Sequence, residues 1–285
     1  MTVFRGQALT FSRVGPALEV TLHREPLNEL GTTALRELEL LAEHVRGGAG
    51  GARALILHSD RRGGFCAGAD LRELHAGLIA RRAALADRLG PAAPVAGRVL
   101  RPLVRREIRK FIDRIHAVFD TLDTAPLTTI AVVHGVCFGG GFELALTADV
   151  IIAEKSARFA FPELRLGLVP GFGGIPRLNR DLGNAVVRDL LLTGRSINAR
   201  RAHAVGLVSQ VVGRDNGLDV ARKVAEQAAR FDPHTTAEAK AFAKRLPREE
   251  LDREKDTFCR LVTRPPVLAA LTKFVESTDV RPYLP

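Results

Sequence analysis

Short apolar runs alternate with stretches of helical spacing along most of this 285-residue chain. Three such runs, at 52–59 (ARALILHS), 128–135 (TTIAVVHG) and 149–156 (DVIIAEKS), have the length of a buried strand. Residues 29–47 instead place their leucines near helical spacing and end at a glycine pair. Because strands that alternate with helices pack in layers, this order predicts an α/β fold.

The N-terminal residues and the cysteines narrow the class of protein. MTVFRGQALTFSRVGPALEVTLHRE alternates apolar and polar residues, which predicts two strands joined by a turn at Gly15–Pro16. It has no signal-peptide core, and no apolar run reaches the roughly 18 residues of a membrane span. Cys66, Cys137 and Cys259 are odd in number and lack CxxC spacing. We therefore expect a cytoplasmic protein without disulfides, zinc or contact with a membrane.

The chain is strongly basic, with a formal net charge of +10. Arginine greatly outnumbers lysine, a bias that is typical of genome composition. A basic protein nevertheless attracts polyanions, and coenzyme A, an acidic carrier protein and RNA all qualify. Charge alone leaves these three partners open.

Much of this charge lies in residues 75–115, a segment with many arginines and few acids. A solvated helical lid would have this composition, and so would the wall of an acyl pocket or a docking face for a phosphate-bearing partner. Phe111 is the aromatic residue that lies near the basic run, so the segment lacks interleaved rings on which bases could stack. Nucleic acid is therefore the least favoured partner.

The stretch HGVCFGGGFELALTADV (134–150) places three glycines two positions ahead of Glu143. It lacks the lysine of a P-loop and the spacing of a dinucleotide fingerprint, and the chain contains neither G-x-S-x-G nor H-E-x-x-H. A strand, a glycine turn and a helix leave free N–H groups that suit a developing oxyanion. GGFCAGAD (63–70) offers a second such turn. Two turns aimed at one carbonyl oxygen would form an oxyanion hole.

Two glutamates accompany these turns. Glu143 follows the glycines, and Glu163 lies in the turn-rich stretch FAFPELRLGLVPGFGG (159–174). A lone glutamate in such a place is usually a capping or surface residue. A pair near an oxyanion hole can instead hold a water and divide the roles of acid and base.

Four runs together resemble the crotonase (enoyl-CoA hydratase/isomerase) superfamily: FCAGADL, HGVCFGGGFELALTADVIIA, FAFPELRLGLVPGFGG and LLTGRSINARRAHAVGLVSQVV. The resemblance implies a spiral of ββα repeats over residues 1–195, followed by a helical trimerisation region over 196–285. It also implies homotrimers, or hexamers that are dimers of trimers. Segment 75–115 would be an insertion near the acyl pocket. No metal or cofactor is expected, and coenzyme A enters as part of the substrate thioester.

The same resemblance assigns roles to individual residues. The backbone N–H groups of Ala69 and Gly140 would be the oxyanion donors, Glu143 the base toward water and Glu163 the group that exchanges the proton at C2. Positions that would contact the substrate are Arg72, Cys66, Gly68, Asp70, Gly139 and Gly171. Two glutamates favour a hydratase or dehydratase acting on an acyl-CoA or a carrier-protein-bound acyl group. Isomerisation or decarboxylation, which needs one glutamate, is the alternative, and an RNA-binding homologue is a third.

Two basic positions of the family are altered here. HREPLNEL (23–30) is one residue shorter than the family pattern and lacks its lysine, and Ser277 stands where the family has a C-terminal lysine. Arg72 matches a third basic position that contacts coenzyme A. These differences predict an altered substrate, such as a bulky or carrier-bound acyl group.

Overall fold

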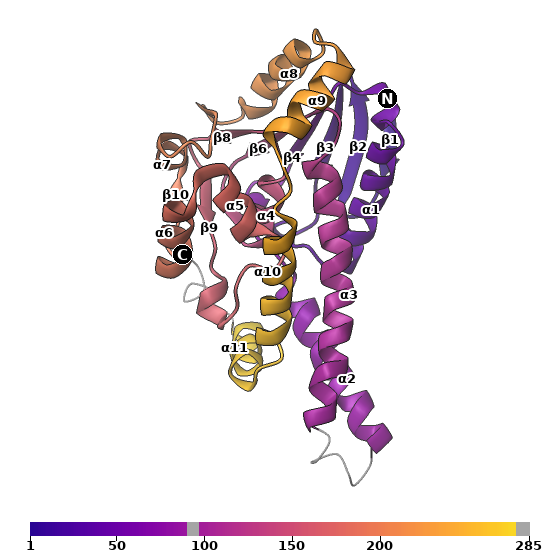
Figure 1. The fold of residues 1–285 in the computed structure, drawn as a ribbon, viewed down its shortest axis with the longest axis vertical. Helices are drawn as coiled ribbons and strands as arrows, with labels where there is room; N and C mark the ends of the chain where they lie inside the picture. Colours follow the sequence, from indigo (N-terminus) through magenta and orange to yellow (C-terminus); the bar gives the residue numbers. More distant parts are fainter. Residues whose placement is uncertain (90–96, 278–285) are drawn as a thin grey trace.

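The computed structural model describes residues 1–89 and 97–277. Its larger sheet has seven strands in the order β1-β2-β3-β4-β6-β8-β11 (Figure 1). Their bounds are β1 (Thr2–Arg5), β2 (Leu9–Val14), β3 (Ala17–Leu22), β4 (Ala54–Ser59), β6 (Thr128–Val133), β8 (Val150–Glu154) and β11 (Gln210–Val212). The first three strands are antiparallel, and each later strand pairs in parallel. Strands β2 and β3 form the predicted hairpin around Gly15–Pro16, whereas β1 is a third strand that was not predicted.

The smaller sheet has the order β10-β9-β7-β5. Its strands are β5 (Gly64–Cys66), β7 (Val136–Phe138), β9 (Arg158–Ala160) and β10 (Ile197–Asn198). Strands β5, β7 and β9 are parallel and each follows a strand of the larger sheet directly in sequence. A helix or 3₁₀ turn comes next each time, giving β4-β5-α2, β6-β7-α4 and β8-β9-η3. The predicted spiral of ββα repeats is confirmed.

The helices are α1 (Thr32–Arg46), α2 (Leu71–Leu89), α3 (Gly97–Asp123), α4 (Gly140–Ala145), α5 (Gly174–Leu182), α6 (Asn184–Thr193), α7 (Ala199–Ala204), α8 (Gly217–Ala228), α9 (Pro233–Ala243), α10 (Arg248–Leu261) and α11 (Pro265–Glu276), with the 3₁₀ turns η1 (Ala49–Gly51) and η3 (Glu163–Leu166). None of the helices in the described part of the chain has both the length and the apolar character needed to cross a bilayer.

Strand β4 shows how the larger sheet is buried on both faces. Leu55 and Leu57 point into the main core, whereas Ile56, between them, belongs to a second core with Ala221 and Ala225 of α8. This alternation follows from the two-residue period of a strand. The small side chains of α8 let that helix lie close against the sheet.

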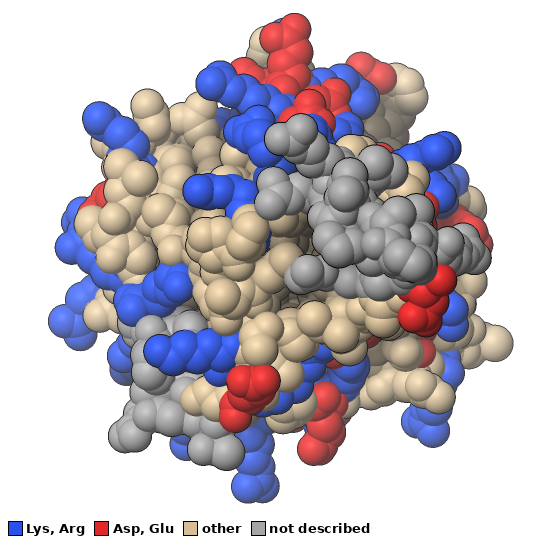
Figure 2. Space-filling view, turned by 90° about the horizontal axis from the view of Figure 1, so that it is seen from below, with Lys and Arg blue, Asp and Glu red and all other residues tan. Residues whose placement is uncertain are grey.

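Helices α2 and α3 form an arm that projects from the molecule (Figure 1). Ile108, Ile112, Ile115 and Phe119 are buried along one side of α3, at helical spacing. Figure 2 looks at the end of the molecule that carries the arm: many basic and fewer acidic side chains lie around its rim, and uncharged residues occupy much of the described surface between them. Residues 90–96 of the predicted insertion lie outside the described residues, and its role stays a prediction.

Residues beyond the expected division at 195 contribute to both sheets. Strand β10 pairs with β9 of the smaller sheet, and β11 pairs with β8 of the larger one. The larger sheet is therefore complete only at Val212, and helices α8 to α11 follow it. The assignment of 196–285 to oligomerisation stays a prediction.

Candidate active site

The two glycine turns lie side by side because β5 and β7 are parallel neighbours. The turn after β5 is fixed by Leu30, whose N–H donates to the carbonyl of Gly68 (2.7 Å) and whose carbonyl accepts from Asp70 N–H (3.1 Å). Ala69 lies between these two partners, so its own N–H points away from Leu30. That N–H is available for a ligand.

The second turn brings Gly140 close to Ala69. A β-carbon on Gly140 would lie 3.4 Å from the amide nitrogen of Ala69, and one on Gly68 would lie 3.2 Å from the amide nitrogen of Gly140. Gly68 and Gly139 have φ of +108° and +48°, which glycine adopts readily. Within the described chain, neither the Ala69 nor the Gly140 N–H donates to a protein group. The structure thus brings together the two predicted oxyanion donors.

Glu143 lies on the first turn of α4 and is buried. Its Oε1 accepts the N–H of Phe172 (2.7 Å) and the N–H of Gly174 (2.8 Å). Burial raises the pKa of this carboxyl to about 7, although both N–H groups favour the ionised form. Near neutral pH the group can therefore accept or release a proton.

Glu163 opens η3 after β9 and faces the same glycine turn. A β-carbon on Gly139 would lie 2.6 Å from its Oε1, while its Oε2 is buried without a hydrogen-bond partner among the described residues. Burial, and then the charge of Glu143, raise the pKa of Glu163 well above its ordinary value. Buried polar atoms without partners are rare and frequently mark functional sites.

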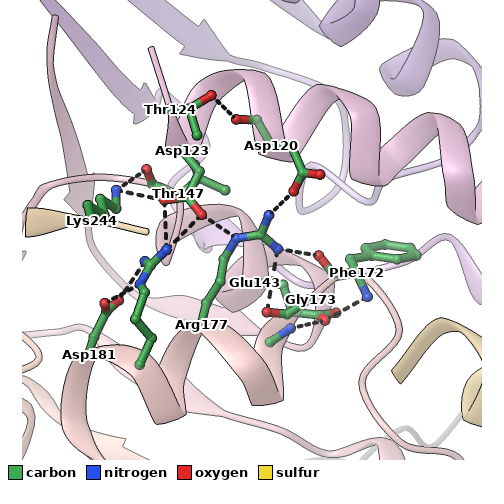
Figure 3. Close-up of polar contacts among 12 residues, drawn as sticks. Asp120, Asp123, Thr124, Glu143, Thr147, Phe172, Gly173, Arg177, Asp181 and Lys244 are labelled. Atoms are coloured by element: carbon green, nitrogen blue, oxygen red, sulfur yellow. Dashed lines mark hydrogen bonds and ion pairs between the residues drawn. The ribbon is translucent and has the colours of Figure 1, made fainter. Parts of the chain in front are cut away.

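A buried ionic cluster supports the loop that holds Glu143 (Figure 3). Arg177 of α5 is fully buried, and its Nε and Nη2 donate to Asp123 (2.8 Å) and Asp120 (2.6 Å) of α3. Its Nη1 donates to the carbonyl of Phe172 (3.0 Å). Sequence reasoning missed this cluster, although an arginine among the apolar residues of IPRL was a signal for it.

Two predicted substrate-binding residues contact other parts of the protein. The Nη1 of Arg72 donates to the carbonyl of Val275 in α11 (2.9 Å). Asp70 accepts the N–H of Glu73 at the start of α2 (2.9 Å) and pairs with Arg24 (2.7 Å). Their roles toward substrate stay predictions.

Cys66 and Gly171 also contact other parts of the protein. The buried Cys66 thiol donates to the carbonyl of Asn28 (3.0 Å), and burial raises its pKa to about 12. Gly171 packs so closely on Phe258 that a β-carbon would lie 2.6 Å from that ring. The substrate contacts predicted for these two residues also stay predictions.

Comparison with known proteins decides the family. The model of the Enoyl-CoA hydratase/isomerase family matches residues 100–280, a range that includes Gly140, Glu143 and Glu163. The chain belongs to the enoyl-CoA hydratase/isomerase family. This confirms the resemblance drawn from the sequence motifs.

Curated members of the family are similar over different shares of their length. Human (Homo sapiens) mitochondrial methylglutaconyl-CoA hydratase is 34% identical over 182 residues, which cover 64% of this chain and 46% of that protein. Carnitinyl-CoA dehydratase of Citrobacter koseri is 35% identical over 234 residues, 82% of this chain and 79% of that protein. The matched part spans about half the length of several other curated relatives, for example 50% of the rat (Rattus norvegicus) hydratase.

Solved structures of the family share the fold. Enoyl-CoA hydratase from Bacillus anthracis is 28% identical with a TM-score of 0.70, covering 95% of this chain and 96% of that one. Enoyl-CoA hydratase from Bacillus halodurans is 20% identical with a TM-score of 0.76, covering 93% and 99%. At that identity the second match speaks for the fold alone. The crotonase fold predicted from the sequence is confirmed.

Proposed function

We propose that this chain is an enoyl-thioester hydratase or dehydratase, which adds or removes water across the C2–C3 double bond of an acyl-CoA or carrier-bound acyl group. The observation that carries the proposal is the placement of two carboxyls with raised pKa beside two free N–H groups. The relatives described above support it, since their names specify a hydratase and a dehydratase.

In the proposed reaction the thioester carbonyl oxygen lies between the N–H groups of Ala69 and Gly140. These donors polarise the enoyl group and stabilise the negative charge that grows on the oxygen as the enolate forms. Loss of one such donor typically costs about 2.7–4 kcal/mol of transition-state stabilisation. Because the donors belong to the backbone of two tight turns, they need no rearrangement during the reaction.

The glutamates then divide the proton transfers. One oxygen of Glu143 is occupied by two backbone N–H groups, so the other is left to accept a proton from the water that attacks C3. Glu163, whose pKa is raised well above its ordinary value, enters the reaction protonated and delivers a proton to C2. Dehydration runs the same steps backward. The two carboxyls titrate as a coupled pair.

Replacing each glutamate by its amide tests this function. Glu143→Gln and Glu163→Gln keep the size of the side chain and remove the proton transfer, so each should lower hydration of 2-enoyl-CoA esters by about 100-fold or more. Glu249→Gln, on the exposed face of α10, is the matched control and should leave the rate unchanged. Turnover at the wild-type rate in both active-site variants would remove the glutamates from the mechanism.

Isomerisation of the double bond is the alternative that a relative favours. A protein of Zymoseptoria tritici, 34% identical over 187 residues, is named an enoyl-CoA isomerase/hydratase. That reaction needs one carboxyl to move a proton between carbons and consumes no water. Two carboxyls lie at the glycine turn here, and a pair can hold a water and divide the roles of acid and base, which favours the reaction with water.

The wall of the acyl pocket, the oligomeric state and the cellular location are also part of the proposal. We infer that the arm formed by α2 and α3 walls the acyl pocket and that the chain acts as a homotrimer or a dimer of trimers. Its three cysteines are free and buried, which supports a reducing, cytoplasmic location. A panel of enoyl-CoA esters assayed beside their carrier-protein equivalents would define the substrate.

A further inference from the structure

The loop formed by residues 171–175 divides its N–H groups between two glutamates. Phe172 and Gly174 donate to Glu143, as described above. The alternate residues donate to Glu254 of α10: Gly173 N–H to Oε1 (2.6 Å) and Ile175 N–H to Oε2 (2.9 Å). Both carboxyls are buried, so neither set of N–H groups can rely on water instead.

Side chains also form hydrogen bonds with the carbonyl groups of this loop. His116 of α3 contacts the carbonyl of Gly171 through Nε2 (2.9 Å), so that nitrogen carries the proton. Burial lowers the pKa of His116 to about 3, which keeps the ring neutral. Arg177 donates to the next carbonyl, that of Phe172. Successive peptide groups of the loop are thus each fixed by a side chain.

The buried N–H groups of this loop have few other hydrogen-bond acceptors within reach. Gly173 has a φ of +100°, outside the range of a strand or right-handed helix, and a β-carbon there would collide with Arg177. A buried N–H without an acceptor costs about 1–3 kcal/mol. If Glu254 released Gly173 and Ile175, the loop would shift to find other acceptors, and the two N–H groups on Glu143 would move with it.

We propose that Glu254 is a positioning residue, which fixes the loop of residues 171–175 and thereby orients the Glu143 carboxyl toward the substrate. The inference rests on the proposed function only for the role of Glu143. It also gives α10 a second role, because this helix of the predicted oligomerisation region reaches the active site through a carboxyl that lies 81 residues from Gly173 in the sequence.

The arrangement has an electrostatic consequence that supports the assignment. Burial, and then the charge of Glu143, raise the pKa of Glu254 above its ordinary value, while the two loop N–H groups oppose that rise. Two carboxyls that share one loop therefore disfavour each other's ionised form.

Glu254→Gln is the variant that tests the proposal, with the exposed Glu250→Gln of the same helix as the matched control. The amide retains one acceptor but turns its NH₂ toward a backbone N–H. Hydrogen exchange followed by mass spectrometry on peptides spanning 171–175 reads the loop directly and needs no turnover. Steady-state kinetics on 2-enoyl-CoA esters then separate kcat from KM.

We expect Glu254→Gln to speed exchange of the loop amides at least about tenfold. We also expect kcat to fall about 100-fold, the loss that a misplaced catalytic group can cause, with KM within about threefold of wild type. Glu250→Gln should match wild type in both assays. If Glu254→Gln fails to fold, Glu254→Asp, which keeps the charge on a shorter side chain, should show the same changes at smaller size.

Two results would overturn the proposal. Unchanged loop exchange would show that Glu254 does not hold the loop, and faster exchange with wild-type kcat would show that the loop does not orient Glu143. A wild-type protein without activity on enoyl thioesters is a separate outcome: it refutes the proposed function, while the exchange data still decide whether Glu254 holds the loop.

Discussion

Gly140 stands at a place where a side chain would block the proposed oxyanion hole. A β-carbon there would lie 2.8 Å from the ring of Phe172 as well as 3.4 Å from the amide nitrogen of Ala69. Its φ lies outside the left-handed region, so the need for glycine comes from space around the N–H groups and not from backbone strain. The glycine turn before a helix predicted a free N–H in this stretch, and the resemblance to the crotonase superfamily assigned it to Gly140. The crowding by Phe172 was not predictable.

Gly140→Ala should lower kcat/KM for hydration by about 100-fold or more, since one donor is displaced or covered. Gly77→Ala is the control, because a β-carbon on that helical glycine meets no atom within 4 Å. Kinetics of both variants on one enoyl-CoA ester check the prediction. An active Gly140→Ala enzyme would show that the carbonyl oxygen binds elsewhere.

The raised pKa of Glu143 predicts how activity and stability depend on pH. As a base it must be ionised, so kcat/KM should fall as the pH drops through about 7. Its folded-state pKa exceeds the ordinary value of 4.5, so its contribution to stability is complete below pH 4.5 and is lost as the pH rises through about 7.

Glu143→Gln keeps Oε1 as acceptor and cannot ionise. Its melting temperature should therefore exceed that of wild type by more at pH 8 than at pH 5. Thermal unfolding at the two values checks this. A constant difference between the two proteins would show that the Glu143 carboxyl is not shifted.

Helix α3, one of the two helices of the arm, contacts the ionic cluster at the active site through the buried carboxylate of Asp123. Asp123 contacts Arg177 and Arg180, which both lie on α5, and Lys244 at the end of α9. Burial alone would raise the pKa of Asp123, but Lys244, Arg177 and Arg180 outweigh it and hold the pKa below its ordinary value. Ion pairs to Asp123 therefore hold helix α3 against the rest of the protein, in addition to the packing of its apolar side.

Asp123→Asn should cost about 3–5 kcal/mol in the free energy of unfolding, because it leaves a fully buried arginine without this partner. Asp256→Asn, which removes an exposed partner of Arg109 between α3 and α10, should cost at most about 1 kcal/mol. Urea unfolding of both variants compares them directly. Equal losses would contradict the special role of the buried pair.

The elements were predictable to different degrees. Strands of the larger sheet follow from apolar runs of six residues, such as β4 and β6. The strands of the smaller sheet have two or three residues, which is too few for the two-residue period of a strand to be recognised in the sequence. No sequence pattern marks Glu254, because its contact with the loop depends on packing between α10 and α5, which local sequence does not encode.

At the scale of the whole molecule, the exposed surface of helix α9 bears on the oligomeric state. Helix α9 has no buried residue, and the ring of Phe242 on it is 80% exposed. A contact between subunits over this helix would remove that ring from water. The proposed trimer would give such a helix a partner.

Light scattering coupled to gel filtration should give a mass about three times that of the 30.9 kDa chain, or six times for a pair of trimers. Phe242→Glu would place a charge on the outer face of α9 and should shift the mass toward the monomer if this helix lies in the contact. A monomeric wild-type protein at micromolar concentration would contradict the proposed assembly.

The chemistry itself is tested most directly by the fate of solvent oxygen. The protein is incubated with a 2-enoyl-CoA ester in water enriched in heavy oxygen, and the product is analysed by mass spectrometry. A hydratase gives a 3-hydroxyacyl product that carries one heavy oxygen at C3, and Glu143→Gln should abolish it. A rearranged enoyl product without solvent oxygen would contradict water addition and identify the enzyme as an isomerase.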